Sequence, residues 1–419
     1  MQIYLVGGAV RDALLGLPVK DRDWVVVGAT PEQMLAAGYR PVGRDFPVFL
    51  HPQTGEEYAL ARTERKTGSG YRGFQVHAAP GVTLEQDLAR RDLTINAMAV
   101  PVQALRPDGG FEPGNVALVD PWGGRQDLTQ RRFRHVTDAF REDPVRILRL
   151  ARLAARLPDF TVAPQTRALV HEMVDAGEID HLVPERVWRE LATGLMEQRP
   201  SRLLECLRDG GALARLLPEV AALWGVPQRA EHHPEVDTGA HLLLVLDMAA
   251  RLQASLAVRF ALLCHDLGKA LTPPGQWPRH IGHEGRSLHL LRRLAERWRI
   301  PADCLELAEV VAQEHGNIHR SGDLQPGAVL RLLERCDALR RPQRFELALL
   351  ACECDARGRL GRQDDGYAPR ERLARALRTV LSVDTAACAR EAGARGLNGP
   401  QVGAAIRQAR VQALAGALD

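Results

Sequence analysis

The arrangement of apolar residues changes near residue 140, and this change limits the folds that the chain can adopt. Up to that point, short runs typical of β-strands alternate with helical patterns and Gly/Pro turns, which indicates an α+β domain. Beyond it, strand signals become rare and helix follows helix. The strand-like runs cover residues 2–6, 24–27, 48–51, 57–61 and 75–78. The chain is therefore predicted to be α+β, with a small N-terminal mixed β-sheet and a mostly α-helical body.

The helical body requires more than one core, because 419 residues exceed the size of a typical single domain. Turn-rich stretches separate the helical patterns, and one break is expected at 215–230. The predicted helices cover residues 144–156, 165–176, 184–197, 200–208, 239–253, 255–268, 284–298, 302–315 and 327–335.

The composition is that of an ordinary soluble protein, with 45% hydrophobic and 26% charged residues. A net charge of +3 identifies no partner. Seven cysteines, scattered from Cys206 to Cys388, do not form a disulfide framework. Charges interrupt every apolar segment before it reaches ~18 residues, and no signal peptide is recognisable. We therefore expect a cytoplasmic protein without membrane contact.

Two aspartates stand on alternate positions directly before the apolar run "WVVV". In a strand, alternate residues point to one face, so Asp21 and Asp23 would project together. Neighbouring carboxylates repel each other unless a cation lies between them, and Mg²⁺ prefers such oxygen ligands together with substrate phosphates. A solvated turn before a strand would show the same pattern, so the pattern alone leaves both interpretations open.

The preceding residues favour the metal hypothesis. Gly7 and Gly8 lie between a predicted strand and a predicted helix, where backbone N–H groups and the helix dipole attract phosphate. Arg11 follows one helical turn later and adds a cation. Nucleotidyl transfer needs such a phosphate cradle beside a carboxylate pair, since metal ions can activate an attacking hydroxyl and stabilise leaving pyrophosphate.

With these motifs the chain resembles the polymerase-β-like nucleotidyltransferases, in the branch that contains class II tRNA CCA-adding enzymes and bacterial poly(A) polymerases. The resemblance starts at "GGAVRDALLG" followed by "KDRDW". The segments "RTERKTGSGYRGF" (62–74), "RRDLTINAMA" (90–99) and "EDPVRILRLAR" (142–152) match the same branch in order. Nearly the whole chain resembles the bacterial multifunctional CCA-adding enzymes that carry a fused HD domain.

The resemblance implies catalytic roles in the N-terminal domain. It assigns Asp21 and Asp23 as Mg²⁺ ligands and aligns Glu57 with the third carboxylate of the family. A shift by one residue would place Glu56 there instead. The triphosphate contacts implied in the same way are Gly8, Arg11 and Arg91.

The segment from 142 to 152 suggests how a protein could select bases. Asp143 and Pro144 are typical of the start of a helix, on which Arg146, Arg149 and Arg152 continue a polar stripe that a solvated basic face would also produce. Cytosine and adenine each present an amine beside a ring-nitrogen acceptor, so a carboxylate and a guanidinium would accept both and reject uracil and guanine. The resemblance implies this role for Asp143 and Arg146, and implies that Arg149 and Arg152 line the nucleotide site. It places the switch from C to A addition partly in the glycine-rich loop at 66–73.

Histidines between 232 and 319 form a second motif. His265-Asp266 ends an apolar helical pattern, His241 lies upstream and Asp355 lies downstream. This order resembles the H…HD…D pattern of HD phosphohydrolases, in which imidazole and carboxylate hold Mg²⁺ or a transition metal such as Ni²⁺. The resemblance implies these four residues as ligands.

Other histidines leave alternatives open. His233 competes with His241 for the first position of the motif, while His280, His283 and His315 could hold a second metal or contact phosphate.

Together the resemblances imply a tRNA nucleotidyltransferase that adds and repairs the 3′-terminal CCA from CTP and ATP without a nucleic-acid template. They imply phosphatase, 2′,3′-cyclic phosphodiesterase and 2′-nucleotidase activity for the HD domain, and a monomer or homodimer that binds the tRNA acceptor region. A poly(A) polymerase, or an HD phosphohydrolase whose N-terminal domain only binds RNA, are the alternatives. The predicted segments are a nucleotidyltransferase domain at 1–140, a nucleotide-selecting and tRNA-binding helical domain at 141–225, an HD domain at 226–358 and a helical tail at 359–419.

Overall fold

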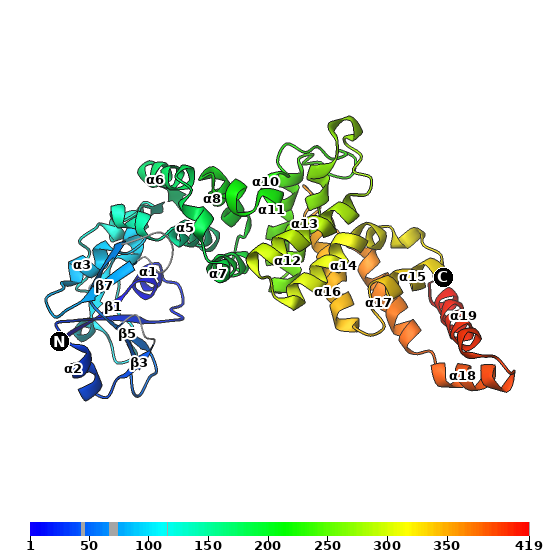
Figure 1. Ribbon diagram of the computed structural model, residues 1–419, viewed down its shortest axis with the longest axis horizontal. Helices are drawn as coiled ribbons and strands as arrows, with labels where there is room; N and C mark the ends of the chain where they lie inside the picture. Colours follow the sequence, from blue (N-terminus) through cyan, green and yellow to red (C-terminus); the bar gives the residue numbers. More distant parts are fainter. Residues whose placement is uncertain (43–46, 67–73, 115, 419) are drawn as a thin grey trace. The chain divides into compact units, whose positions relative to one another are not determined.

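The computed structural model describes residues 1–42, 47–66, 74–114 and 116–418 (Figure 1). Residue contacts divide the chain into two compact units. Unit 1 comprises Met1–Val187 and Asp209–Leu216, and unit 2 comprises Trp188–Arg208 and Leu217–Asp419. The loop expected to switch specificity falls almost entirely on 67–73, outside the described residues. The division into four segments stays a prediction.

Unit 1 is built on a mixed sheet of six strands. These are β1 (Gln2–Val6), β2 (Asp23–Val27), β3 (Arg40–Val42), β4 (Val48–Leu50), β5 (Glu57–Leu60) and β8 (Ala99–Pro101). They are ordered β3-β4-β5-β2-β1-β8, and β2 pairs parallel with β5 and antiparallel with β1. The middle of β2 is a run of buried apolar residues, as expected for a strand covered on both faces. The predicted mixed sheet is confirmed.

Short strands and helices complete unit 1. β6 (Arg62–Lys66) pairs with β7 (Phe74–Ala78), and β9 (Arg132–Phe133) pairs with β10 (Thr161–Val162). The helices are α1 (Gly8–Leu14), α2 (Pro31–Ala36), α3 (Leu84–Ala89), α4 (Gly124–Thr129), α5 (Val145–Arg156), α6 (Pro164–Asp175) and α9 (Ala212–Leu216), with 3₁₀ turns η1 (Thr94–Asn96), η2 (Val102–Ala104), η3 (Asp138–Glu142) and η4 (Glu178–His181). Helices α2 and α3 both begin with a Thr…Gln capping box.

Unit 2 is helical. After α7 (Pro184–Leu195), within which the unit boundary falls, come α8 (Ser201–Asp209), α10 (Pro218–Ala221), α11 (Thr238–Arg251), α12 (Leu256–Cys264), α13 (His283–Trp298), α14 (Ala302–His319), α15 (Pro326–Arg335), α16 (Pro342–Arg357), α17 (Ala368–Leu381), α18 (Thr385–Ala394) and α19 (Gly399–Leu418), with η5 (Leu267–Leu271), η6 (Pro274–Gln276) and η7 (Ser321–Asp323). Helix α12 packs against α11, α14 and α16, which explains its apolar sequence "LAVRFALLC". The predicted helical body is confirmed.

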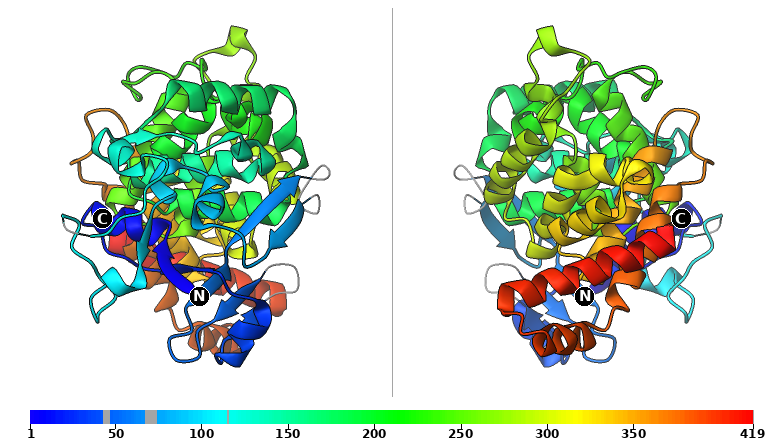
Figure 2. Two further views of the ribbon diagram at one scale, coloured as in Figure 1. Left: turned by 90° about the vertical axis from the view of Figure 1, so that its left-hand side faces the viewer. Right: turned by 90° about the vertical axis from the view of Figure 1, so that its right-hand side faces the viewer.

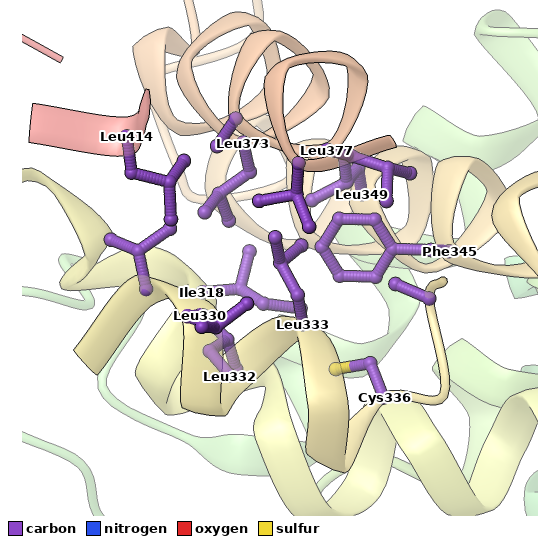
Figure 3. Packing of buried hydrophobic residues seen from close by; sticks show 14 of the residues in the cluster. Ile318, Leu330, Leu332, Leu333, Cys336, Phe345, Leu349, Leu373, Leu377 and Leu414 are labelled. Atoms are coloured by element: carbon purple, nitrogen blue, oxygen red, sulfur yellow. The ribbon is translucent and has the colours of Figure 1, made fainter. Parts of the chain in front are cut away.

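The C-terminal helices share a hydrophobic core with the helices that precede them. Figure 3 shows Leu373 and Leu377 of α17 and Leu414 of α19 packed with Ile318 of α14 and Phe345 of α16. Helix α19 lies beside α18, and it also packs on α15 and α17 (Figure 2). The segment predicted as a tail is therefore anchored to α14, α15 and α16.

Across the ranges that the structure describes, no helix has the length and the apolar content that crossing a bilayer requires.

Candidate functional site

Two candidate catalytic carboxylates occupy matching positions on neighbouring strands of unit 1. The parallel register of β2 and β5 pairs Asp23 with Glu57, so the two exposed side chains lie on the same face of the sheet. Glu56, the alternative to Glu57, instead accepts hydrogen bonds from Trp24 Nε1 and Thr54 Oγ1, each at 3.2 Å. The register therefore favours Glu57 as the third carboxylate.

Asp21 lies outside the strand that the alternate spacing predicts. Strand β2 begins at Asp23, and Asp21 is an exposed residue of the irregular segment before it. Among the described residues, the groups of potential ligands with atoms within 4.8 Å of one another do not include these two aspartates with Glu57. Asp23 and Glu57 therefore lie at the starts of two neighbouring strands with Asp21 just before one of them, but the three carboxylates do not form a group close enough to share one cation in this structure.

Gly7 brings the backbone close to the carboxylate of Asp23 and the guanidinium of Arg91. It joins β1 to α1 at a φ of 73°, a left-handed conformation that glycine adopts without strain. A Cβ at Gly7 would lie 3.0 Å from Arg91 Nη1 and 3.6 Å from Asp23 Oδ2. Only glycine leaves open this space between a guanidinium and a candidate metal ligand, and such a cradle fits a metal-bound phosphate.

Arg11 is turned into unit 1. Its side chain donates to Asp12 Oδ1 at 2.9 Å and to Asn96 Oδ1 at 2.7 Å, and burial lowers the pKa of the guanidinium. Asp12 also accepts from Arg156 at 2.7 Å. Arg11 therefore joins α1 to η1, and its contact with a triphosphate stays a prediction, as does that of Gly8.

A buried carboxylate, Asp92, connects the "RRDLTINAMA" segment to α5. Its Oδ2 accepts from Arg149 Nε at 2.8 Å, and its Oδ1 accepts from Asn96 Nδ2 at 3.0 Å. Burial alone would raise the pKa of Asp92, but the charge of Arg149 and these hydrogen bonds hold it well below its usual range. No sequence pattern marks Asp92, because only the fold brings it to Arg149.

The predicted base-selecting carboxylate is held by a residue that sequence analysis missed. Arg186 of α7 donates to both oxygens of Asp143, at 3.1 and 2.6 Å. Asp143 also accepts from Val145 N, although the cap position of α5 falls on Pro144, one residue later than predicted. The Arg146 guanidinium is buried and donates to a backbone carbonyl, that of residue 139, at 2.7 Å.

Unit 2 brings three of the predicted HD ligands together. His241 of α11, His265 at the end of α12 and Asp355 of α16 are buried and form one group of ligand atoms within 4.8 Å. His241 Nε2 lies 2.9 Å and His265 Nε2 lies 4.0 Å from Asp355 Oδ1. His233 lies in a separate group with Glu235 and His241: its ring packs edge to face on His241 with centroids 4.6 Å apart, and its Nδ1 lies 3.2 Å from Glu235 Oε1. Because His241 and not His233 is grouped with His265 and Asp355, the structure favours His241 as the first histidine.

A second group adjoins the first. Asp266, the fourth predicted ligand, is grouped with His283 and His315. Asp266 Oδ1 lies 3.4 Å from His283 Nε2 and 3.6 Å from His315 Nε2, while its Oδ2 lies 3.1 Å from His265 Nε2. His280 is engaged elsewhere, with its ring nitrogens 2.9 Å from Thr272 Oγ1 and from the carbonyl of residue 227.

The histidines present a uniform donor set to these groups. The Nδ1 atoms of His265, His283 and His315 lie 2.7–2.9 Å from backbone carbonyl oxygens, which directs the Nε2 atoms inward. Such bonds are typical of histidines that ligate metals. His265 Nε2 and Asp266 Oδ1 are buried atoms without a hydrogen-bond partner among the described residues. Since unpartnered buried polar atoms are rare, these residues fit a bound cation.

Lys269 adds a charge beside the second group that sequence analysis did not single out. Its buried ammonium donates to Asp266 Oδ2 at 2.7 Å and also to Gln228. The spacing of three residues in "HDLGK" was the available signal, but it did not distinguish Lys269 from a surface lysine.

Comparisons with known proteins cover both units. A model described as "Poly A polymerase head domain" matches residues 3–134, and one described as "Probable RNA and SrmB- binding site of polymerase A" matches residues 159–223. A model described as "HD domain" matches residues 238–357.

Curated relatives are similar over their whole length. A protein of Variovorax paradoxus (strain S110) is 66% identical over 415 residues, which cover 99% of each chain. One of Verminephrobacter eiseniae (strain EF01-2) is 68% identical over 415 residues, 99% of this chain and 98% of its own. One of Burkholderia multivorans (strain ATCC 17616 / 249) is 62% identical over 419 residues, 100% of this chain and 99% of its own. All three are called "Multifunctional CCA protein".

Solved structures share the fold at lower identity. The Bacillus stearothermophilus CCA-adding enzyme in complex with CTP is 23% identical with a TM-score of 0.63, and covers 99% of this chain and 89% of its own. The Thermotoga maritima CCA-adding enzyme complexed with tRNA_CCA is 20% identical with a TM-score of 0.53, and covers 92% of this chain and 79% of its own. At these identities the likeness concerns the fold.

Proposed function

Since the chain belongs to the family of bacterial multifunctional CCA proteins, we propose that unit 1 adds nucleotides to tRNA and that unit 2 hydrolyses phosphate esters through its HD residues. The protein is a CCA-adding tRNA nucleotidyltransferase with an HD phosphohydrolase domain, and both domains are metal-dependent. The observation that carries the first activity is the pairing of Asp23 with Glu57 beside Gly7 and Arg91.

In unit 1, Asp21, Asp23 and Glu57 would hold Mg²⁺, which lowers the cost of activating a hydroxyl and of releasing pyrophosphate. Asp23 is the register partner of Glu57, and its Oδ2 lies 3.6 Å from where a Cβ at Gly7 would stand, so the missing side chain keeps space open beside it for phosphate. The 3′-hydroxyl of tRNA attacks the α-phosphorus of CTP or ATP, a phosphodiester bond forms, and the bond to pyrophosphate breaks. Arg91 lies close enough to Gly7 to balance the triphosphate charge.

Base selection is assigned to Asp143 and Arg146. The carboxylate accepts from the exocyclic amine of cytosine or adenine, and the guanidinium donates to the neighbouring ring nitrogen. Arg186 holds both oxygens of Asp143, so the acceptor keeps one orientation. A base with a carbonyl in place of the amine would offer the Asp143 carboxylate no donor. An unpaired buried carboxylate costs more binding free energy than a loss of shape fit does. Arg149 and Arg152 would line the same site.

In unit 2, His241, His265 and Asp355 would hold one divalent cation, and Asp266 with His283 and His315 would hold a second. Mg²⁺ or a transition metal such as Ni²⁺ suits this mixture of imidazole and carboxylate, and supplies an activated water for hydrolysis. The substrates would be 2′,3′-cyclic phosphates and phosphomonoesters at damaged tRNA ends.

The partners follow from the reaction. The helices of the chain would bind the tRNA acceptor region through its shape and its phosphates, so binding should weaken with salt. The solved neighbours include CCA-adding enzymes with tRNA_CCA, with CTP and with ATP. We infer a cytoplasmic protein that works as a monomer or a homodimer.

The test of the main activity uses tRNA that lacks its last three nucleotides, Mg²⁺ and each labelled nucleotide in turn. Ordered uptake of two C and one A is expected. Unlimited addition of A would instead support a poly(A) polymerase, and no addition would support a protein whose N-terminal domain only binds RNA. Identity of 62–68% to multifunctional CCA proteins over nearly the full chain favours the first outcome.

A further inference from the structure

The two oxygens of Asp355 face different partners. Oδ1 lies near His241 and His265, the other members of its ligand group. Oδ2 points the other way and accepts a hydrogen bond from His319 Nε2 at 2.6 Å. Only Oδ1 is therefore directed at the proposed cation, and the orientation of the carboxylate depends on what holds Oδ2.

His319 is itself held by a residue of the C-terminal segment. It is the last residue of α14, and its Nδ1 lies 2.8 Å from the hydroxyl of Tyr367. The two rings pack edge to face with centroids 5.7 Å apart. A neutral imidazole has one donor and one acceptor nitrogen, so donation from Nε2 to Asp355 leaves Nδ1 to accept from the tyrosine. Burial raises the pKa of Tyr367, so its hydroxyl keeps the proton that it donates.

The position of Tyr367 is fixed by the packing of α17. Tyr367 directly precedes α17, ten residues beyond the end of the matched HD model at 357. Leu373 and Leu377 of this helix are buried in the cluster of Figure 3 together with Ile318, which is one residue from His319. An ion pair also joins Arg370 of α17 to Glu353 of α16, and Glu353 is two residues before Asp355.

We propose that Tyr367 and His319 are positioning residues of the HD site, which hold Asp355 with Oδ1 directed at the cation. The segment after residue 358 thereby completes the hydrolase site. This inference rests on the proposed metal role of Asp355. Residues behind metal ligands commonly set the orientation and basicity of those ligands, and their loss lowers metal affinity.

The experiment titrates metal-stripped, full-length protein with Co²⁺ and records both the affinity and the visible absorption spectrum. The His265→Ala variant defines which part of the signal belongs to the HD site. His319→Ala should lower the affinity of that site about 10- to 100-fold and change the spectrum. Tyr367→Phe, which removes one hydrogen bond and keeps the ring, should lower it about three- to tenfold. His319→Gln should restore part of the loss, because its amide can donate to Asp355.

Tyr4→Phe is the matched control, since among the residues that the structure describes the Tyr4 hydroxyl donates to its neighbour Gln2, at 3.0 Å in unit 1. Retained CCA addition by every HD variant shows that unit 1 is folded, and an unchanged far-UV circular dichroism spectrum shows that the helices of unit 2 are formed. If the wild type binds Co²⁺ at the HD site and both the His319→Ala and Tyr367→Phe variants match its affinity and spectrum, this inference is overturned alone. If the wild type shows no signal that His265→Ala removes, the proposed HD site falls and this inference falls with it.

Discussion

Asp23 and Glu57 are partners in the parallel register of β2 and β5, whereas the carboxylate of Glu56 accepts a hydrogen bond from Trp24. The pairing places both carboxylates on one face of the sheet, and the backbone at Gly7 lies close to Asp23 and to Arg91. The register therefore favours Glu57 over the adjacent Glu56 as the third catalytic carboxylate, a choice that the sequence left open.

The first prediction distinguishes these glutamates. Glu57→Gln should slow the addition of C by about 100-fold or more, the scale of losing one charge-stabilising group at a reaction centre. Glu56→Gln should stay within about threefold, because its amide oxygen can still accept from Trp24 Nε1 and the partly exposed ion pair with Arg22, at 3.6 Å, contributes little. Single-turnover rates of both variants measure the difference, with an unchanged thermal unfolding curve as the folding control. Equal losses would contradict the register argument.

The second prediction concerns base choice. Arg186→Ala should reduce the preference for C and A over U and G about tenfold, because Asp143 loses both of its hydrogen bonds from Arg186 and, among the described residues, keeps only the one from Val145 N. Arg186→Lys should recover little, since an ammonium cannot form the two parallel bonds. The ratio of kcat/KM values for CTP and UTP measures the effect. Arg189→Ala, at an exposed position of the same helix, is the control, and the idea fails if it matches Arg186→Ala.

The third prediction links Asp92 to stability. The pKa of Asp92 is lowered in the folded chain, so its ionised form stabilises the fold at every pH above the unfolded value of about 4. Asp92→Asn should lower the free energy of unfolding by about 1–3 kcal/mol at pH 7, and the difference from wild type should shrink only below about pH 4.

Calorimetry on the full-length chain at several pH values tests this expectation. Asp159→Asn is the control, because Asp159 pairs with Arg131 at the surface with 71% of its side chain exposed. That substitution should change stability by less than about 0.5 kcal/mol. A constant difference between wild type and Asp92→Asn down to pH 3 would argue against the stabilising charge.

The fourth prediction separates the two activities. His265→Ala should abolish hydrolysis of 2′,3′-cyclic phosphates and lower the bound metal, while CCA addition continues. His280→Ala should retain metal and most hydrolysis, since both ring nitrogens of His280 bind protein atoms away from the ligand groups. Phosphate release and metal content of the purified proteins provide the measurements. Loss of CCA addition in His265→Ala would instead indicate misfolding.

Local patterns predicted the elements well. The run at 2–6 is β1, the run at 48–51 is β4, and the stripe at 144–156 is α5, each to within about one residue. Apolar periodicity, glycine turns and capping residues act over a few residues, so they are visible in the sequence. Strand β2 begins at Asp23, one residue before the predicted run of 24–27, so strand alternation does not place Asp21 on the face of Asp23; strand ends depend on pairing with neighbours.

Partners distant in sequence escaped prediction. Arg186 lies 43 residues from Asp143, and Tyr367 lies 48 residues from His319. Neither has a spacing or composition that marks it, since an arginine in a helix and a tyrosine before one are ordinary residues. The H…HD…D motif also did not predict that Asp266 is grouped with His283 and His315 rather than with His241.

The sequence by itself determined the α+β class, the helical body, the family resemblance and the residue types that can bind metal and phosphate. Tertiary structure alone decided that Glu57 pairs with Asp23, that Arg11 is buried with Asp12, and that the C-terminal segment reaches the HD ligands. The physical reason is the distance along the chain over which each interaction acts. Propensity and amphipathic pattern act between near neighbours, whereas strand register, buried ion pairs and shared cores depend on the packing of elements that the chain brings together only when it folds.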